Sequence, residues 1–426
     1  MGQLSLARLL SAPARVPDTA EPCVPDHPVN PEIRLLDGAW YQARPLEAYG
    51  WMRRNAPVYW DPSASLWGVA RHADVQLVSR SPETFCSGKS SRPEPGSWIP
   101  SMINLDDPEH KRRRNLVNKG FTKRRVDDHE PKIRRIVNEL IDRVAERGEC
   151  EFVSELAAPL PMIVIGDMLG VKPEDRDKLL RWSDDMLRGL GTGDPGLAQR
   201  ATAAGLEYID YARRVIADRK RNPTDDLMSV LVFAEIEGAG LTEEEVIQES
   251  LLILVGGDET TRHVITEGAE ALIRHPDQRR KLIDDPSKLP VAVEEMLRWV
   301  TPIKNMNRTA TCDTELRGQK IREGDRVLLL YHSANRDEQA FDAPDVFDVE
   351  REPNEHVAFG GFGTHFCLGA SLARLELRVA FEVLLERLPD LELAQAGPVG
   401  LRPNNFIVGI EKMPVRFAPR GRSDRA

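Results

Sequence analysis

The stretch Phe359-Gly-Gly-Phe-Gly-Thr-His-Phe-Cys-Leu-Gly369 places one cysteine, Cys367, between a glycine-rich loop and a helical pattern. The loop glycines Gly360, Gly361 and Gly363 allow positive φ and a close backbone approach to a flat ligand. Beyond the cysteine, apolar residues recur at helical spacing: Leu368, Leu372, Leu375, Val379, Val383 and Leu384. The cysteine therefore precedes a helix start, where free backbone N–H groups favour a thiolate over a thiol.

A soft, anionic sulfur suits an iron that must cleave an O–O bond. We therefore interpret Cys367 as the metal-binding axial ligand of haem b, with Phe359, Gly361 and Gly369 contributing to the haem site. The other cysteines are scattered without a close pair, and they predict neither a disulfide framework nor a zinc site. They are Cys23, Cys86, Cys150 and Cys312.

Composition indicates a large globular protein. The chain has 426 residues, 41% of them hydrophobic and 30% charged, and its net charge of −10 disfavours nucleic acid as a main partner. No apolar run approaches the roughly 20 residues that span a bilayer, so we expect no membrane span and a cytoplasmic location. Residues 1–30, rich in proline and small residues, predict a poorly ordered arm. Residues 31–426 predict a single, mainly helical domain with small β-sheets.

Periodicity predicts the main elements. The longest helical pattern begins at Thr242, which forms a capping box with Glu245, and runs to His275. About 33 residues at roughly 1.5 Å each make a rod of order 50 Å that must cross the core. Shorter patterns predict helices over 131–144 and 158–169, a hairpin of 57–60 with 66–70, a pairing of 316–321 with 326–331, and a strand over 405–410.

The middle of the long helix reads Gly256-Gly-Asp-Glu-Thr-Thr261. Because each interior glycine costs roughly 1 kcal/mol relative to alanine, Gly256 and Gly257 imply a local purpose or tolerance by packing. Thr260 can bond back to the carbonyl of Gly256 and open a bulge beside the backbone. We expect dioxygen there, with the Thr260 hydroxyl holding it or its water and Glu259 relaying protons. An ordinary buried Thr-Thr pair is the alternative.

Two further groups of charged residues are candidates for the site. Glu295 and Arg298 stand three apart on the next predicted helix among apolar neighbours, which favours a buried ion pair that Arg351 could join. The role of this ion pair would be structural. Four residues could bind the two propionates of haem, although each alone could be a surface or capping residue: His110, Arg114, Arg308 and His365.

Together and in this order, the cysteine loop, the acid-threonine helix and the Glu-x-x-Arg pair resemble the cytochrome P450 superfamily of haem-thiolate monooxygenases, over about residues 31 to 418. The resemblance implies a mostly helical triangular prism, with haem between the long distal helix and the proximal Cys367 loop. It carries the propionate contacts and the ion-pair triad over to the residues named above. One departure is Gly360, because the family usually has Phe seven residues before the cysteine. Either Phe359 or Phe362 could then shield the sulfur.

Longer stretches are similar to actinobacterial enzymes that hydroxylate the terminal methyl of a sterol side chain, in particular that of cholesterol or cholest-4-en-3-one. The stretches are 146–150, 157–162, 166–170, 181–185, 256–263 and 295–299. Related sequences also oxidise macrolides, polyketides and other lipids, and such a substrate is the alternative.

The resemblance implies insertion of one oxygen atom from dioxygen into a C–H bond, which requires two electrons. Because the sequence shows no flavin-binding or iron–sulfur motif, we expect a separate ferredoxin and ferredoxin reductase. Eight basic residues and no acid lie between Lys111 and Arg125. We predict that an acidic ferredoxin docks near Arg112, Arg113 and Arg124, and the alternative is a solvated helix face.

Position relative to the motifs nominates an apolar pocket, whose residues could equally be core: Trp98, Ile99, Met102, Val255, Ile303, Met306 and Ile407. We expect a substrate held mainly by burial, at roughly 25 cal/mol per Å². Two other functions compete. A peroxide-driven haem enzyme would not need Glu259 and Thr260 as a proton relay, and a non-catalytic haem sensor leaves the acid-threonine segment unexplained.

Overall fold

The computed structural model describes residues 27–94, 100–189, 194–236 and 238–422. It confirms the prediction of a mainly helical protein with small β-sheets. No helix within these ranges is long and apolar enough to cross a bilayer. The helices are α2 (Gly38–Gln42), α3 (Leu46–Asn55), α4 (His72–Ser79), α5 (Glu109–Asn118), α6 (Lys123–Asp127), α7 (Glu130–Asp142), α8 (Pro159–Met168), α9 (Arg176–Gly189), α10 (Pro195–Arg221), α11 (Leu227–Phe233), α12 (Glu243–Arg274), α13 (Pro276–Asp284), α14 (Leu289–Val300), α15 (Tyr331–Ala334) and α16 (Ala370–Arg387).

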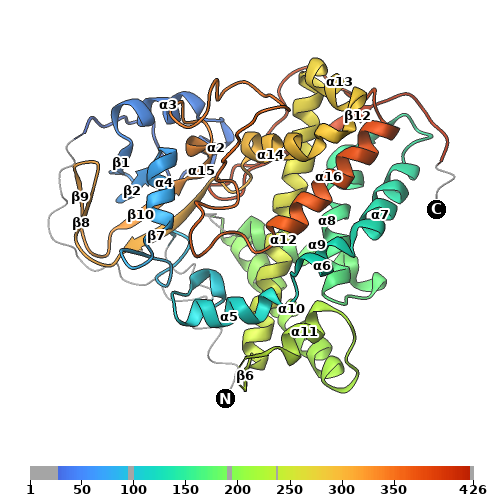
Figure 1. The fold of residues 1–426 in the computed structure, drawn as a ribbon, viewed down its shortest axis with the longest axis horizontal. Coiled ribbons are helices and arrows are strands. Elements are labelled where there is room, and N and C mark those ends of the chain that lie inside the picture. The colour runs from blue at the N-terminus through green and yellow to red at the C-terminus, as the bar shows by residue number, and fades with distance from the viewer. Residues whose placement is uncertain (1–26, 95–99, 190–193, 237, 423–426) are drawn as a thin grey trace.

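Helix α12 is the element predicted from Thr242 to His275. The Thr242 hydroxyl accepts from the Glu245 backbone N–H at 3.2 Å, and the Glu245 carboxylate accepts from the Thr242 N–H at 2.8 Å, so the capping box is present. The helix ends before Pro276, which cannot continue it. Figure 1 shows α12 crossing the middle of the molecule, and it packs against α8, α9, α14 and α16.

The main sheet has the strand order β1-β2-β10-β7-β3 and lies on the opposite side of α12 from helices α7 and α8 (Figure 1). Strands β1 and β2 form the predicted antiparallel hairpin, and β10 pairs parallel with β2 and antiparallel with β7. The strands are β1 (Val58–Asp61), β2 (Leu66–Val69), β3 (Phe85–Cys86), β4 (Glu149–Glu151), β5 (Glu235–Ile236), β6 (Ala239–Gly240), β7 (Asn305–Ala310), β8 (Thr314–Leu316), β9 (Gln319–Ile321), β10 (Arg326–Leu330), β11 (Glu392–Leu393) and β12 (Pro414–Arg416).

Two predictions about strands were wrong. The segment 316–321 does not pair with 326–331, because Arg317 and Gly318 adopt positive φ and turn the chain within the segment, so that β8 and β9 pair with each other. The segment 405–410 forms only isolated bridges, of Ile407 with Ile303 and of Ile410 with Leu401. The bridge to Ile303 holds this segment beside the residues that precede β7 without extending the sheet.

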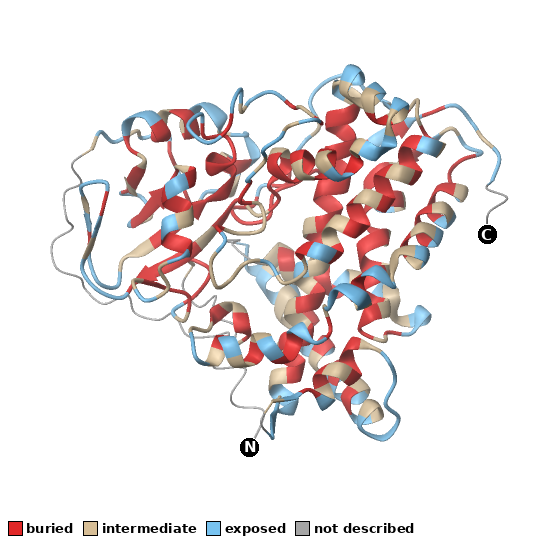
Figure 2. Ribbon diagram, viewed as in Figure 1, coloured by how far each residue is buried: buried red, intermediate tan, exposed pale blue. Residues whose placement is uncertain are grey.

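Burial divides α12 into two halves. Figure 2 shows that the helices around it are buried mostly where they face one another. From Asp258 to Leu272 nearly every residue of α12 is buried, including the polar ones, whereas Leu251, Leu252, Val255 and Gly256 are partly or fully open. The expected N-terminal arm lies outside the described residues up to position 26. Residue His27 is placed, with its ring 5.2 Å from that of Tyr59.

Candidate active site

The cysteine loop packs against α4, and this contact accounts for two of its glycines. A Cβ on Gly361 would lie 2.3 Å from Ser79 Oγ, and one on Gly363 would lie 1.8 Å from the Ser79 carbonyl oxygen. Gly361 was predicted to touch the cofactor, but its close approach is to α4, and it is not among the residues lining the cavity described below. Gly360, at φ +98°, supplies a backbone angle that side chains disfavour.

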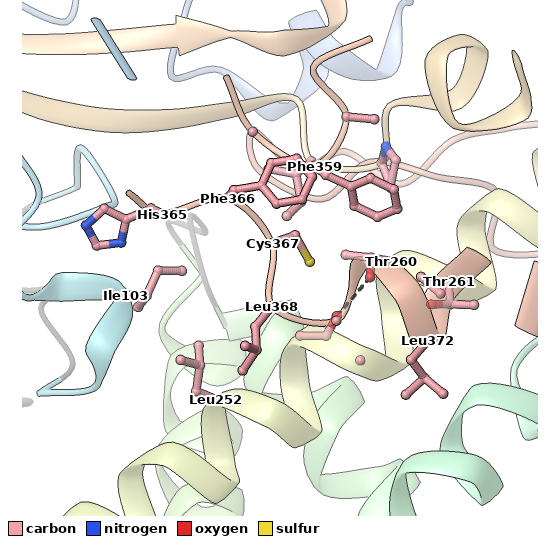
Figure 3. A pocket seen from close by; sticks show the side chains of 18 of the residues that line it. Ile103, Leu252, Thr260, Thr261, Phe359, His365, Phe366, Cys367, Leu368 and Leu372 are labelled. Atoms are coloured by element: carbon pink, nitrogen blue, oxygen red, sulfur yellow. Dashed lines mark hydrogen bonds between the residues drawn. The ribbon is translucent and has the colours of Figure 1, made fainter. Parts of the chain in front are cut away.

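Cys367 closes the loop and opens on a cavity. Its backbone N–H donates to the Phe359 carbonyl at 2.9 Å, and α16 begins three residues later. Figure 3 shows the sulfur directed into the cavity, on whose far side Thr260 lies. Enclosure by the protein raises the pKa of the thiol, while the Gly369 N–H and the guanidinium groups of Arg114 and Arg374 oppose this increase. The site therefore holds a thiol whose ionised form has nearby donors.

The phenylalanines of the loop take different positions. The Phe359 ring lines the cavity, with the Arg374 guanidinium 4.6 Å from its centroid. Phe362 instead has 42% of its surface exposed, and its ring stacks on that of Phe366. Of the two candidate rings, only Phe359 lies on the cavity side of the loop.

The cavity lies between the cysteine loop and α12 and holds about 1460 Å³ of space not filled by atoms, its opening to solvent included. Apolar side chains from several elements dominate its wall. They include Met102, Ile103, Phe121, Ile165, Leu252, Ile253, Val264, Leu297, Ile303, Met306 and Leu372. Such a space takes a large apolar ligand or a cofactor together with a substrate.

Basic groups gather at the cavity wall. The four residues predicted to bind propionates all line it: His110, Arg114, Arg308 and His365. The His110 and His365 rings lie 4.1 Å apart. Burial, followed by the charge of Arg308 and the neighbouring His110 and Arg114, lowers the pKa of His365 to about 2. Arg114 also donates to the carbonyl oxygen of Phe366 at 2.6 Å, which ties α5 to the cysteine loop.

These residues fit haem. Haem carries two carboxylates, which would neutralise the basic cluster. Its iron would take a soft donor such as the sulfur of Cys367. On the opposite face, a Cβ added to Gly256 would meet nothing within 4 Å. Space is therefore open beside the backbone of α12 where the sequence predicted it.

The acid-threonine segment faces this space without breaking the helix. The Thr260 hydroxyl donates to the Gly256 carbonyl at 2.8 Å, as predicted from their spacing. However, α12 is an uninterrupted α-helix, so the expected bulge is absent. Gly257 lies against Ile165, whose side chain would be 3.2 Å from an added Cβ. The room at Gly256 thus comes from its missing side chain and not from distortion of the backbone.

Glu259 is completely buried and held by two arginines. Its carboxylate accepts hydrogen bonds from Arg262, on the same helix, and from Arg402, in the C-terminal segment. Burial would raise the pKa of Glu259, but the His263 ring and the two guanidinium groups lower it to about 2. The Arg402 guanidinium also forms ion pairs with Glu411, at 3.0 Å, and with Asp184 of α9, at 3.4 Å. A chain of charges therefore runs from the buried acid to the half-buried Glu411.

Glu295, Arg298 and Arg351 come together away from the cavity. Glu295 and Arg298 are fully buried and joined by two hydrogen bonds of 2.7 and 2.8 Å, and Arg351 donates to Glu295 at 3.1 Å. Arg298 also donates to the carbonyl oxygens of Asn335 and Pro344. The group thus satisfies the backbone of the segment that leads to the cysteine loop.

Only some of the residues that were predicted to form the substrate pocket line the cavity. Met102, Ile303 and Met306 line the cavity, while Ile407 belongs to a small apolar cluster against which Val255, Ile303 and Met306 pack. Trp98 and Ile99 lie outside the described residues. Sequence reasoning missed Tyr331, Glu376 and Arg402. The first two line the cavity and the third binds Glu259, but no local pattern marks any of them.

The basic segment is less free than its composition suggests. Arg113 is buried and pairs with Glu109, Glu245 and Glu249. Arg112 pairs with Glu109 and Glu245, and only 32% of its side chain is exposed. The Arg124 side chain is 92% exposed. Two of the three predicted docking arginines thus belong mainly to the contact of α5 with α12.

The chain is similar to known proteins in sequence and in fold. The Cytochrome P450 family model matches residues 194–411. Steroid C26-monooxygenase from Mycolicibacterium smegmatis is 51% identical over 91% of this chain and 97% of that protein. Methyl-branched lipid omega-hydroxylase from Mycobacterium bovis is 40% identical over 87% of this chain and 90% of that protein. The crystal structure of CYP109E1 from Bacillus megaterium in complex with testosterone has a TM-score of 0.82 at 34% identity, covering 89% of this chain and 99% of that one.

Proposed function

This chain belongs to the cytochrome P450 family of haem-thiolate monooxygenases, and we propose that it hydroxylates the terminal methyl group of a sterol or steroid side chain, such as that of cholesterol or cholest-4-en-3-one. The observation that carries the proposal is the 51% identity to Steroid C26-monooxygenase over nearly the whole of both chains. The apolar wall of the cavity supports it, because a sterol offers little except apolar surface to bury.

The cofactor of this reaction is haem b, held by Cys367 and by the basic cluster at the cavity wall. When bound, it supplies the cleavage of dioxygen and the insertion of one oxygen atom into a C–H bond. The role of Cys367 is to present sulfur to one face. The roles of His110, Arg114, Arg308 and His365 are to neutralise and orient the propionates.

The remaining residues orient substrate and protons. Gly256 leaves space for the end of the side chain beside α12, and Thr260 presents its hydroxyl oxygen to the same space while donating to the Gly256 carbonyl. Glu259 is the acid that delivers protons to this hydroxyl. Because Arg262 and Arg402 hold it ionised, its carboxylate must first receive a proton, and the charged chain to Glu411 is the route from the surface that we assign.

Two electrons come from a separate protein, for which we propose a ferredoxin served by a ferredoxin reductase. The exposed Arg124 remains a candidate contact. Charge reversal at Arg113 would instead break the buried pair with Glu249. A test of docking near Arg112 and Arg113 must therefore compare the rate of reduction by ferredoxin with the stability of each variant.

A second candidate function is hydroxylation of a methyl-branched lipid, favoured by the 40% identity to the omega-hydroxylase. Both substrate classes end in a branched methyl group and differ in the ring system behind it. The test is a titration of the purified haem-loaded protein with cholest-4-en-3-one and with a methyl-branched fatty acid, followed by product analysis with ferredoxin, reductase and NADPH. A high-spin shift and a terminal alcohol from the sterol support the proposal. Product from the fatty acid alone would overturn it in favour of the second function.

A further inference from the structure

Glu249 is a buried acid on α12 that the proposed reaction does not use. It is fully enclosed, and it lies about three helical turns before Glu259. Leu252 and Ile253, which follow it by three and four residues, both line the cavity, so the acid lies one turn earlier on the cavity side of the helix. Because burying a carboxylate is costly unless it is paired, its partners indicate what it does.

The carboxylate joins α12 to one part of the cavity wall, residues 100–104, which we call the wall segment. Its Oε1 accepts a hydrogen bond from the backbone N–H of Met102 at 2.9 Å. Met102 begins the short 3₁₀-helix η1 (Met102–Asn104), and both Met102 and Ile103 line the cavity. Figure 3 shows Ile103 and Leu252 at the cavity wall. One side-chain oxygen of the long helix therefore fixes the backbone that carries two wall residues.

The wall segment is held at two further points. Arg113 of α5 pairs with Glu249 at 3.2 Å and donates to the carbonyl oxygen of Pro100 at 2.8 Å. The Asn104 side chain accepts from the backbone N–H of Ser91 at 2.7 Å. The segment is thus hydrogen-bonded near its start, its middle and its end. The middle contact, to Glu249, is made by a residue that itself lines the cavity.

The charge of Arg113 alone does not explain this acid. Glu109 and Glu245 also pair with Arg113, at 3.2 and 3.1 Å. Both are more exposed than Glu249, so they balance the guanidinium at a smaller cost of desolvation. What Glu249 adds to the group is the hydrogen bond to the Met102 backbone.

We propose that Glu249 is a positioning residue that makes the cavity selective for a rigid ring system over a flexible chain, by fixing Met102 and Ile103 at its wall. A rigid ligand needs a wall that is already in place, whereas a flexible chain can follow a wall that has moved. Glu249 acts through Met102 and does not itself line the cavity. The inference rests on the proposed function in taking this cavity as the substrate site, and it adds a determinant of the choice between a sterol and a methyl-branched lipid.

The test compares Glu249→Met with Glu249→Gln in the haem-loaded protein. Glutamine keeps an oxygen that can accept from the Met102 N–H, whereas methionine has a similar length and only a weakly accepting sulfur. Amide hydrogen exchange of the wall segment should therefore be about tenfold faster in Glu249→Met and close to wild type in Glu249→Gln. Glu249→Ala is a second variant, in which water can reach the freed N–H so that no buried donor is left unpaired, and its wall segment should also exchange faster.

Selectivity is measured by the spin shift with cholest-4-en-3-one and with a methyl-branched fatty acid. Glu249→Met should raise the Kd for the sterol about tenfold and the Kd for the fatty acid much less, with kcat at saturating sterol nearly unchanged. Glu249→Gln should keep the wild-type ratio of the two Kd values. Gly268→Ala is the matched control, because it strains the same helix against Phe381 at a position that does not line the cavity. It should lower the Tm without changing either Kd.

The outcomes separate this proposal from the proposed substrate. Unchanged exchange of the wall segment in Glu249→Met overturns the proposal whatever the substrate is. An equal loss of affinity for both ligands, or a loss as large in Gly268→Ala, also overturns it, because the effect would then follow stability and not the wall. A wild-type protein that responds only to the fatty acid overturns the proposed function, and the exchange experiment still decides the role of Glu249.

Discussion

The guanidinium of Arg402 is hydrogen-bonded to the carboxylate of Glu259, a residue 143 positions earlier in the chain. With Arg262 it places two positive charges on one fully buried acid. The contact joins the C-terminal segment to the centre of α12. The acid of the acid-threonine segment is therefore controlled by a residue far from it in sequence.

Removing Arg402 should destabilise the fold. Arg402→Leu leaves the buried Glu259 with one arginine in place of two and also removes the bond to Glu411, so the free energy of unfolding at neutral pH should fall by about 3 kcal/mol. Urea denaturation measures this change. The double variant Glu259→Gln/Arg402→Leu should recover part of the loss, because it no longer buries an undercompensated charge. Equal losses in the single and double variants would contradict the role of Glu259.

The contribution of Glu259 should depend on pH. Its folded pKa of about 2 lies below the value of about 4.3 for a free glutamate. A depressed pKa stabilises the fold above the unfolded pKa, and this stabilisation is lost as pH falls toward the folded pKa. The stability difference between wild type and Glu259→Gln should therefore shrink between about pH 5 and about pH 2. A constant difference across this range would show that the carboxylate does not titrate in this way.

Thr260→Ala should separate oxygen consumption from product formation. The variant keeps the cavity and the basic cluster but loses the hydroxyl that faces them, so haem loading should be normal. Product formed per dioxygen consumed should fall roughly tenfold or more, with hydrogen peroxide released instead. Thr260→Ser, which keeps a hydroxyl, is the matched control and should retain most of the coupling. Full coupling in the alanine variant would remove Thr260 from the proton path.

Gly256→Ala and Gly268→Ala should change stability in opposite directions. At Gly256 a Cβ meets nothing within 4 Å, so alanine should stabilise α12 by about 0.5–1 kcal/mol through helix propensity. At Gly268 a Cβ would lie 2.9 Å from the Phe381 ring, and alanine should destabilise through overpacking. Only Gly256→Ala should weaken the sterol-induced spin shift, because it projects into the cavity. Thermal unfolding and a sterol titration of both variants check this.

Breaking the buried ion pair should cost far more than breaking a surface pair. Arg298→Met leaves Glu295 buried with an incomplete set of partners and should lower the free energy of unfolding by about 3–5 kcal/mol. Arg416, whose side chain is 64% exposed, pairs with Glu392 on the surface. Arg416→Met should have little effect. Similar urea midpoints for the two variants would contradict a structural role for the buried group.

The features of the site that could be predicted from the sequence are those determined by the spacing of residues within one helix. The capping box at Thr242, the hydrogen bond of Thr260 to Gly256 and the closeness of Glu295 to Arg298 all join residues three or four apart, where helical geometry determines the contact. The mainly helical fold follows for the same reason, because apolar periodicity is a property of single segments.

Contacts between distant segments could not be read in the same way. Nothing near Arg402 marks it as a partner of Glu259, since the two meet only after the C-terminal segment folds over α12. The glycines at 361 and 363 were predicted to let the backbone approach a ligand. A glycine in the sequence indicates only that a side chain would not fit at that position. It does not record which neighbour fills that space, and here the neighbour is Ser79. The pairing of β8 with β9 was missed because the turn at Arg317 was taken as part of a strand.

The two halves of α12 have consequences for how this enzyme could diversify. Residues from Ile265 to Leu272 are buried, and Gly268 packs against Met296 of α14 and Phe381 of α16, so almost any change there is a change in folding. Gly256 and the neighbouring Leu252 face the cavity, and a new side chain at Gly256 meets no atom of the protein. Substitutions on that face can change the substrate preference while the buried part of the helix and its packing are conserved. One helix therefore separates the positions at which new specificities can arise from those that selection for a stable fold must protect.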